Sequence, residues 1–264
     1  MPKVTLNGTG IYFQVDGAGP RNFLLFNGLG CTTRTWGEMA EGLAGIGHVV
    51  RFDLRGAGRT DFPEQTFTLE TLAGDGLALL DFLNITQASL VGHAYGGRVA
   101  QVFARDFPNR VKALILCGTG GLFPPLPTVN SIDVGNPNID RTTWEEGLLA
   151  QMCGPEFRHQ QPERAQRFLD DMWAERAPRT GVGRQRQAAQ ATRVITYWGI
   201  ASVPTLLLYG TEDRFGHAQN AHDLASRLRK SKLVFIDGAG HMAIREQPDR
   251  LLAEISVFLR EQGL

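Results

Sequence analysis

The stretch Leu90–Arg98, which reads Leu-Val-Gly-His-Ala-Tyr-Gly-Gly-Arg, constrains the fold of this chain more than any other. An apolar run ends at Gly92, and a helical pattern follows at Val99–Phe107. Glycines on both sides of the centre let a strand and a helix approach where a Cβ atom would clash. We therefore predict a strand at Ser89–Gly92, a tight turn with Ala94 at its strained centre, and a helix.

Apolar runs alternate with helical patterns along most of the chain. Continuous apolar runs are typical of strands that are covered on both faces. The predicted strands are Val4–Leu6, Ile11–Val15, Phe23–Phe26, Val49–Leu54, Ser89–Gly92, Val111–Cys117, Thr205–Tyr209 and Leu233–Asp237. The predicted helices are Trp36–Leu43, Leu69–Leu83, Val99–Phe107, Ala218–Leu228 and one that begins at Pro248. This alternation predicts an α/β fold with a mostly parallel sheet flanked by helices on both faces.

Residues 122–198 interrupt the alternation. They contain helical patterns at Trp144–Met152, Pro162–Glu175 and Gln185–Trp198, and no β-type run. We predict that residues 1–121 and 199–264 form one core domain. Residues 122–198 are then a helical cap, inserted between two strands of the sheet rather than folded as an independent domain.

Charge and cysteine content exclude several classes of protein. The 264 residues include 27 Lys and Arg and 27 Asp and Glu, so the formal net charge is zero. Nucleic acids and anionic membranes need a basic face, and we expect neither as a partner. Cys31, Cys117 and Cys153 are widely spaced and odd in number, which predicts no disulfide framework and a cytoplasmic setting. The N-terminal residues lack a signal-peptide pattern, and no run is long enough to span a bilayer.

The Leu90–Arg98 stretch has the layout of a nucleophile elbow, G-x-S-x-G, with the expected strand before it and helix after it. Ala94 stands where the serine belongs. Asp213 and His241 each follow a predicted strand, in the chain order nucleophile, acid, histidine that this elbow requires. The carboxyl ends of parallel strands meet at one edge of a sheet, so we expect these residues to gather there. Taken singly, Asp213 could be a helix cap and His241 an ordinary loop histidine.

A carboxylate on one ring nitrogen fixes the tautomer that a histidine needs to accept a hydroxyl proton. Glu212 competes with Asp213 for this role, and we rank it lower because Asp213 fits the loop spacing better. Two backbone N–H groups are expected to form an oxyanion hole, those of Tyr95 and of Leu29 in the Asn27–Gly30 loop. That loop could also be a plain strand-to-helix turn.

The predicted cap supplies apolar side chains for a substrate pocket over the elbow. We select Trp144, Met152 and Trp198 as candidate substrate-binding residues, although any one of them could instead belong to the core of the cap. The other histidines do not cluster, and no G-x-G-x-x-G pattern is present, so we expect no metal and no nucleotide cofactor. The expected partner is a small-molecule substrate, and the chain is compatible with a homo-oligomer.

With these motifs in place, the chain resembles the α/β-hydrolase fold superfamily over almost its whole length. The residues that carry the resemblance are Asn27-Gly28-Leu29-Gly30, Asp53-Leu54-Arg55-Gly56-Ala57-Gly58, Gly92-His93-Ala94-Tyr95-Gly96-Gly97, Gly210-Thr211-Glu212-Asp213, and Gly240-His241 followed by Glu246-Gln247-Pro248. Within the superfamily it is similar to small bacterial enzymes around 3-oxoadipate enol-lactonase. The resemblance implies a sheet of about eight strands with a helical cap, and hydrolysis of a small ester, lactone or related acyl bond through an acyl-enzyme.

Two residues depart from that pattern. Asn27 stands where many relatives carry histidine, which the mechanism tolerates because the backbone binds the oxyanion. Ala94 has no oxygen to attack with, and loss of a triad nucleophile costs about a million-fold in turnover.

Ala94 has three explanations. It is a serine-to-alanine change made to trap substrate, or it marks a natural non-hydrolytic member, or the protein only binds a ligand. In the second case, a cofactor-free oxygenase or lyase, His241 oriented by Asp213 would deprotonate the substrate directly. We favour the first explanation because the rest of the apparatus is present. The oxygenase is weakened because Asn27–Trp36 contains no second histidine.

Overall fold

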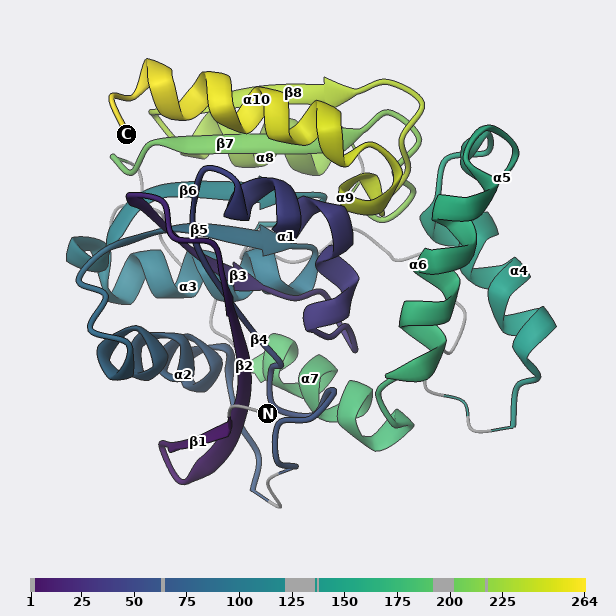
Figure 1. The fold of residues 1–264 in the computed structure, drawn as a ribbon, viewed down its shortest axis with the longest axis horizontal. Coiled ribbons are helices and arrows are strands. Elements are labelled where there is room, and N and C mark those ends of the chain that lie inside the picture. Colours follow the sequence, from purple (N-terminus) through teal and green to yellow (C-terminus); the bar gives the residue numbers. More distant parts are fainter. Residues whose placement is uncertain (1–2, 63–64, 122–135, 137, 192–201, 217) are drawn as a thin grey trace.

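Within the described residues, eight strands form one sheet in the order β1-β2-β4-β3-β5-β6-β7-β8 (Figure 1). The computed structural model describes residues 3–62, 65–121, 136, 138–191, 202–216 and 218–264. The strands are β1 (Lys3–Leu6), β2 (Thr9–Asp16), β3 (Arg21–Phe26), β4 (Gly47–Phe52), β5 (Ala88–His93), β6 (Val111–Cys117), β7 (Thr205–Gly210) and β8 (Ser231–Ile236). The predicted α/β fold is confirmed.

The sheet is parallel except at one edge. β1 and β2 form an antiparallel hairpin, and β2 also pairs antiparallel with β4, whereas all other neighbouring strands are parallel. Asn7 and Gly8, between β1 and β2, both have positive φ, 49° and 73°. This is the backbone that a two-residue hairpin turn of the I′ type needs, and Asn-Gly is its preferred sequence.

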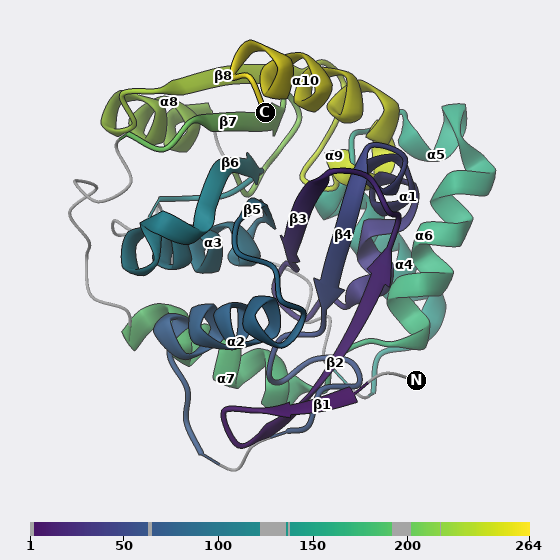
Figure 2. The same ribbon diagram turned by 60° about the vertical axis from the view of Figure 1, so that its left-hand side comes forward.

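Helices cover both faces of the sheet (Figures 1 and 2). α1 (Gly37–Ala44) and α10 (Pro248–Glu261) pack on one face, and α2 (Leu69–Phe82), α3 (Tyr95–Asp106) and α8 (Ala218–Arg227) on the other. In β3, Phe23 and Leu25 pack into the hydrophobic core on the face covered by α1 and α10. Leu24 and Phe26 pack into the core on the opposite face, under α2, α3 and α8. Such two-sided burial explains why this strand is continuously apolar.

Four helices lie between β6 and β7 in the described part of that segment. They are α4 (Arg141–Met152), α5 (Phe157–Gln160), α6 (Pro162–Ala174) and α7 (Arg179–Ala191). α4 to α6 stand together at one end of the molecule, whereas α7 lies beside α2 in both views (Figures 1 and 2). We call these helices the α4–α7 segment. The boundaries predicted for the cap, at 122 and 198, fall outside the described residues, so the domain division stays a prediction.

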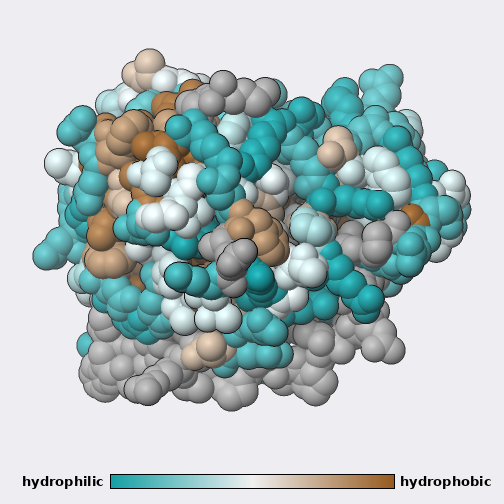
Figure 3. Space-filling model, turned by 90° about the horizontal axis from the view of Figure 1, so that it is seen from below, coloured by the Kyte–Doolittle hydropathy of each residue, from teal (hydrophilic) through white to brown (hydrophobic). Residues whose placement is uncertain are grey.

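The face seen in Figure 3 is mostly hydrophilic, with an apolar area toward its upper left. Val15, Phe62 and Phe82 are the exposed large apolar side chains in the described ranges. None of the described helices is both long and apolar enough to cross a membrane.

Candidate active site

Ala94 joins β5 to α3 in a conformation that residues other than glycine rarely adopt. Its φ and ψ are 49° and −113°, which puts strain into the turn. The surrounding main chain holds it there: the Ala94 N–H donates to the carbonyl of Cys117 at 2.9 Å, and the Ala94 carbonyl accepts from the Thr119 hydroxyl at 2.6 Å. The turn thus has the backbone geometry of an elbow, with a half-buried methyl group at its centre.

The two glycines that flank Ala94 are required by close contacts. A Cβ atom on Gly96 would lie 2.0 Å from the carbonyl oxygen of Phe26, and one on Gly92 would lie 2.5 Å from the Cα of Gly97. Any side chain at these positions would push α3 away from β3 or from its own strand. The predicted reason for the glycine spacing is therefore correct.

Asp213 and His241 meet at the carboxyl ends of β7 and β8. His241 Nδ1 lies 3.0 Å from both carboxylate oxygens of Asp213, and each residue is only 7% exposed. Glu212, the competing acid, is exposed instead. Asp213 Oδ1 also accepts N–H groups from Gly216 at 2.7 Å and Phe215 at 2.8 Å.

Burial by itself raises the pKa of the Asp213 carboxyl, but the His241 ring and the two backbone N–H groups outweigh it. The pKa therefore lies below its usual value, and Asp213 is an anion able to hold His241 in one tautomer.

His93 contacts the main chain of His241. Its Nε2–H donates to the carbonyl of His241 at 3.0 Å, and the two rings are 5.0 Å apart. Burial, followed by the proximity of His241, lowers the pKa of His93 to about 3, so the ring is neutral. His93 is thus a buried, hydrogen-bonded residue of the site.

The loop that carries Leu29 touches the elbow that carries Tyr95. A Cβ atom on Gly28 would lie 2.9 Å from His93 Nδ1, so the loop passes directly over the end of β5. Tyr95 is the first residue of α3, where N–H groups are unpaired within the helix and the helix dipole is positive. The two N–H groups proposed for the oxyanion hole thus come from segments in direct contact.

Asn27, which departs from the family pattern, has a structural task. It is 1% exposed, its Nδ2 donates to the Phe52 carbonyl at 2.7 Å, and its Oδ1 accepts the indole N–H of Trp36. The side chain therefore joins the ends of β3 and β4 to the start of the following helix.

Asp53 joins the loops that follow β3 and β4. Its carboxylate accepts the N–H groups of Thr33 at 2.7 Å and Arg59 at 2.9 Å. Burial raises the pKa of this carboxyl to about 6. The Asp53–Gly58 motif therefore organises the loops beside the elbow, a role that its sequence alone does not reveal.

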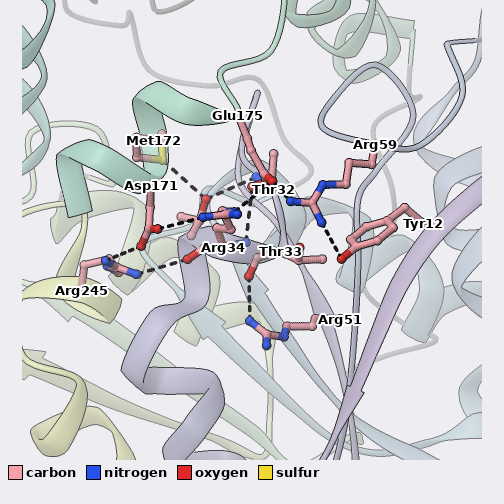
Figure 4. A network of polar contacts seen from close by, with 11 residues as sticks. Tyr12, Thr32, Thr33, Arg34, Arg51, Arg59, Asp171, Met172, Glu175 and Arg245 are labelled. Carbon is pink, nitrogen blue, oxygen red and sulfur yellow. Dashed lines mark hydrogen bonds and ion pairs between the residues drawn. The ribbon is translucent and has the colours of Figure 1, made fainter. Parts of the chain in front are cut away.

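The end of α6 is tied to these loops by charged side chains (Figure 4). Glu175 accepts the Thr32 hydroxyl at 3.0 Å and Arg34 Nε at 2.9 Å, and it also pairs with the guanidinium of Arg59. Its side chain is only 12% exposed. No motif in the sequence marks Glu175.

Asp171, one turn earlier in α6, reaches a third loop. It pairs with Arg34 and, at 3.0 Å, with Arg245, whose side chain is 2% exposed. Arg245 belongs to α9 (Ala243–Glu246), directly after His241. The α4–α7 segment is thus bound to the loops after β3, β4 and β8.

Glu246 fixes the main chain on the approach to His241. Its carboxylate accepts the N–H groups of Gly240 at 3.0 Å and Gly154 at 2.7 Å. Burial raises the pKa of this carboxyl to about 7. The sequence contained Glu246 in a family motif, but only the structure shows its partners.

A model of the family described as alpha/beta hydrolase fold matches residues 21–248. The chain belongs to the alpha/beta hydrolase fold family. The resemblance at the level of the superfamily is confirmed.

Several other proteins are similar to the chain over most of their length. Poly(3-hydroxyalkanoate) depolymerase of Ectopseudomonas oleovorans is 26% identical over 256 residues, which cover 90% of this chain and 84% of the relative. A thermophilic esterase from Thermogutta terrifontis is 24% identical with a TM-score of 0.82, covering 100% of this chain and 99% of the other. The enol-lactonase from Burkholderia xenovorans LB400 is 24% identical with a TM-score of 0.83, covering 98% and 100%. At this identity the solved structures establish the fold alone.

The three substrate-binding candidates of this alpha/beta hydrolase have different environments. Trp144 is fully buried, with its ring edge-on to Trp173 at 5.3 Å. Met152 is half-buried, and its carbonyl accepts the N–H of Met242, next to His241. Trp198 lies outside the described residues.

A pocket of about 310 Å³ opens between the loop after β4 and the start of α7, but neither Ala94, Asp213 nor His241 lines it. Its lining residues are Gly56, Ala57, Gly58, Thr60, Phe62, Pro178 and Thr180. In the described part of the chain, no three His, Cys, Asp or Glu side chains gather as metal ligands.

Proposed function

We propose that this site is that of a serine hydrolase for a small, largely apolar ester or lactone, in a form that lacks its nucleophile at position 94. The carrying observation is the paired, buried Asp213 and His241 beside a strained elbow that persists without a serine. The names of an esterase, an enol-lactonase and a depolymerase among similar proteins support ester and lactone bonds as the substrate class.

In the proposed mechanism a serine at position 94 attacks the acyl carbon while His241 accepts its proton. Asp213 stabilises the imidazolium that forms. The N–H groups of Leu29 and Tyr95 hold the oxyanion, a contribution of about 3 to 4 kcal/mol for a single donor in a comparable site. Proton return to the leaving group gives an acyl-enzyme, which water then hydrolyses. Trp144, Met152 and Trp198 remain our candidates for the substrate pocket.

Ala94→Ser tests this proposal. We expect the variant to hydrolyse activated short-chain esters and lactones at least about 1,000-fold faster than the Ala94 protein, since removal of such a nucleophile costs about a million-fold. It should show a burst of product and be labelled by a serine-directed phosphonate. Adding His241→Ala or Asp213→Asn should remove the gain. A folded Ala94→Ser protein with no gain would refute the proposal.

The hydrogen-bonded pair of Asp213 and His241 also favours a second function, in which the Ala94 protein itself is an oxygenase or lyase. His241 would then take a proton directly from the substrate. The protein as it stands should turn over, for example with oxygen uptake on hydroxylated heteroaromatics, and His241→Ala should abolish that turnover. Ligand binding without turnover in either form would instead indicate a receptor.

We also propose a cytoplasmic setting, which is supported by three cysteines that are free and buried.

A further inference from the structure

Gln185 of α7 lies between two loops of the core and hydrogen-bonds to both. Its Oε1 accepts the N–H of Gly30 at 2.8 Å, and its Nε2 donates to the carbonyl of Arg55 at 2.9 Å. The side chain is completely buried. Because one partner can only donate and the other can only accept, the orientation of the amide is fixed.

The Gly30 N–H belongs to the turn that carries Leu29. The N–H of Cys31 donates to the carbonyl of Gly28 at 3.1 Å, and Gly30, at the third position of this turn, has a φ of 67°. That value is typical of a type II turn, whose central peptide is rotated by about half a turn relative to type I. Gln185 binds the N–H of this central peptide and so favours one orientation. The Leu29 N–H belongs to the preceding peptide, which joins Gly28 to Leu29, and neither bond of Gln185 uses it.

α7 is pressed against the same loops along its first turns. A Cβ atom on Gly181 would lie 2.0 Å from the carbonyl oxygen of Gly56, so the two backbones are in contact. The Leu29 side chain packs against a small apolar cluster of Ala57, Ala177 and Val182. These contacts fix the height and rotation of α7, and with them the position of Gln185.

We propose that Gln185 is a positioning residue that acts through the turn: by fixing the Leu29–Gly30 peptide it holds the adjoining Gly28–Leu29 peptide, and with it the Leu29 N–H, in the orientation that receives the oxyanion. The inference rests on the function proposed above, because it assigns Leu29 to the oxyanion hole. The oxyanion hole would then be completed only when α7 packs against the core loops and brings Gln185 to the turn. A helix of the α4–α7 segment would thereby act on transition-state stabilisation.

The first test compares two variants in the Ala94→Ser background. Gln185→Met removes both hydrogen bonds at similar volume, and kcat should fall about 10- to 100-fold while KM changes less than threefold, because the oxyanion exists only in the transition state. Gln187→Met makes the same change at an exposed position of α7 and should leave both constants unaltered. A kcat within twofold of Ala94→Ser in a folded Gln185→Met protein would overturn the proposal.

Gln185→Glu supplies a rescue test that a purely structural role would not pass. A protonated carboxyl has one acceptor and one O–H donor, as the amide does, whereas the ionised form turns a second oxygen toward the Arg55 carbonyl. Burial raises the pKa of such a carboxyl. The kcat of Ala94→Ser/Gln185→Glu, divided by that of Ala94→Ser, should therefore rise at least fivefold from pH 8 to pH 6. A flat ratio would count against the proposal.

Hydrogen exchange separates this inference from the proposed function. In the Ala94 protein, Gln185→Met should speed exchange of the Gly30 amide at least tenfold, and Gln187→Met should not. If Ala94→Ser is inactive but Gly30 exchange speeds up, the hydrolase proposal fails and the anchoring of the turn is supported. Unchanged Gly30 exchange would refute the anchoring in either case.

Discussion

Two carboxyl groups behind His241 have pKa values displaced in opposite directions. Asp213 is held below its usual pKa by His241 and backbone N–H groups despite its burial, whereas burial raises the pKa of Glu246 to about 7. The negative charge of Asp213 adds to the shift of Glu246. Since two close carboxylates repel each other, this arrangement favours ionisation of Asp213, the group that contacts His241.

Glu246→Gln should change how stability depends on pH. The Glu246 carboxyl binds its proton more tightly in the folded state, with a pKa of about 7, than in the unfolded chain, near 4.5. Its contribution to stability is therefore full below pH of about 4.5 and is lost as the pH rises through 7.

Between pH 5 and pH 8 the free energy of unfolding of the unsubstituted Ala94 protein should fall by roughly 2 kcal/mol more than that of its Glu246→Gln variant. Urea denaturation at the two pH values measures the difference. If the free energies of unfolding of the two proteins changed in parallel with pH, the pKa of Glu246 would not be raised in the folded state.

At the scale of secondary-structure elements, α7 differs from the helices beside it in the sequence. α4 to α6 stand together at one end of the molecule (Figure 1). α7 instead contacts the loops after β3 and β4 through Gly181 and Gln185. Glycine inside a helix normally lowers stability relative to alanine. In α7, Gly181 is there because the Gly56 backbone leaves no room for a side chain.

Two alanine substitutions in α7 should therefore have opposite effects. At Gly183 a Cβ atom would meet nothing within 4 Å, and Gly183→Ala should stabilise the protein by about 0.5 to 1 kcal/mol through helix propensity. Gly181→Ala should destabilise it by about 1 to 3 kcal/mol, because the added methyl group displaces α7 from Gly56. Thermal or urea unfolding of both variants gives the comparison. Changes of the same sign would show that α7 is not tightly docked.

Across the whole molecule, charged side chains join three core loops to the α4–α7 segment (Figure 4). Glu175 faces Arg34 and Arg59 from a largely buried position, and Asp171 connects Arg34 to Arg245. Loss of the Glu175 carboxylate would remove one acidic partner from both Arg34 and Arg59. The network therefore holds the loops after β3, β4 and β8 in fixed positions around Asp213 and His241.

Glu175→Gln should lower the free energy of unfolding by about 1 to 3 kcal/mol, because it keeps the shape of the side chain but removes its charge. The loss should be smaller at high salt, since the charge of Arg34 is half-exposed to solvent and is screened. Asp170→Asn is the matched control in the same helix. Asp170 pairs with Arg141 at the exposed surface, so the midpoint of unfolding of the Asp170→Asn variant should not change. Equal effects of the two changes would argue against the network.

The sequence by itself determined the order of strands and helices and the glycine spacing of the elbow. Both depend largely on residues that are close in the chain. Apolar periodicity sets the backbone, and Gly92 is needed because Gly97, five residues further on, leaves no room for a side chain. It also predicted that Asp213 and His241 would meet, because each follows a strand of one parallel sheet and such strands end at a common edge.

Only the tertiary structure decided which groups hold that site in place. Gln185 lies 155 residues from Gly30, and Glu246 lies 92 residues from Gly154. No local pattern distinguishes Gln185 from the exposed Gln187. The contact between Gly181 and Gly56 fixes the rotation and height of α7. It turns one glutamine toward the Asn27–Gly30 loop and leaves the other in solvent, because a helix buries only the face that its docking selects.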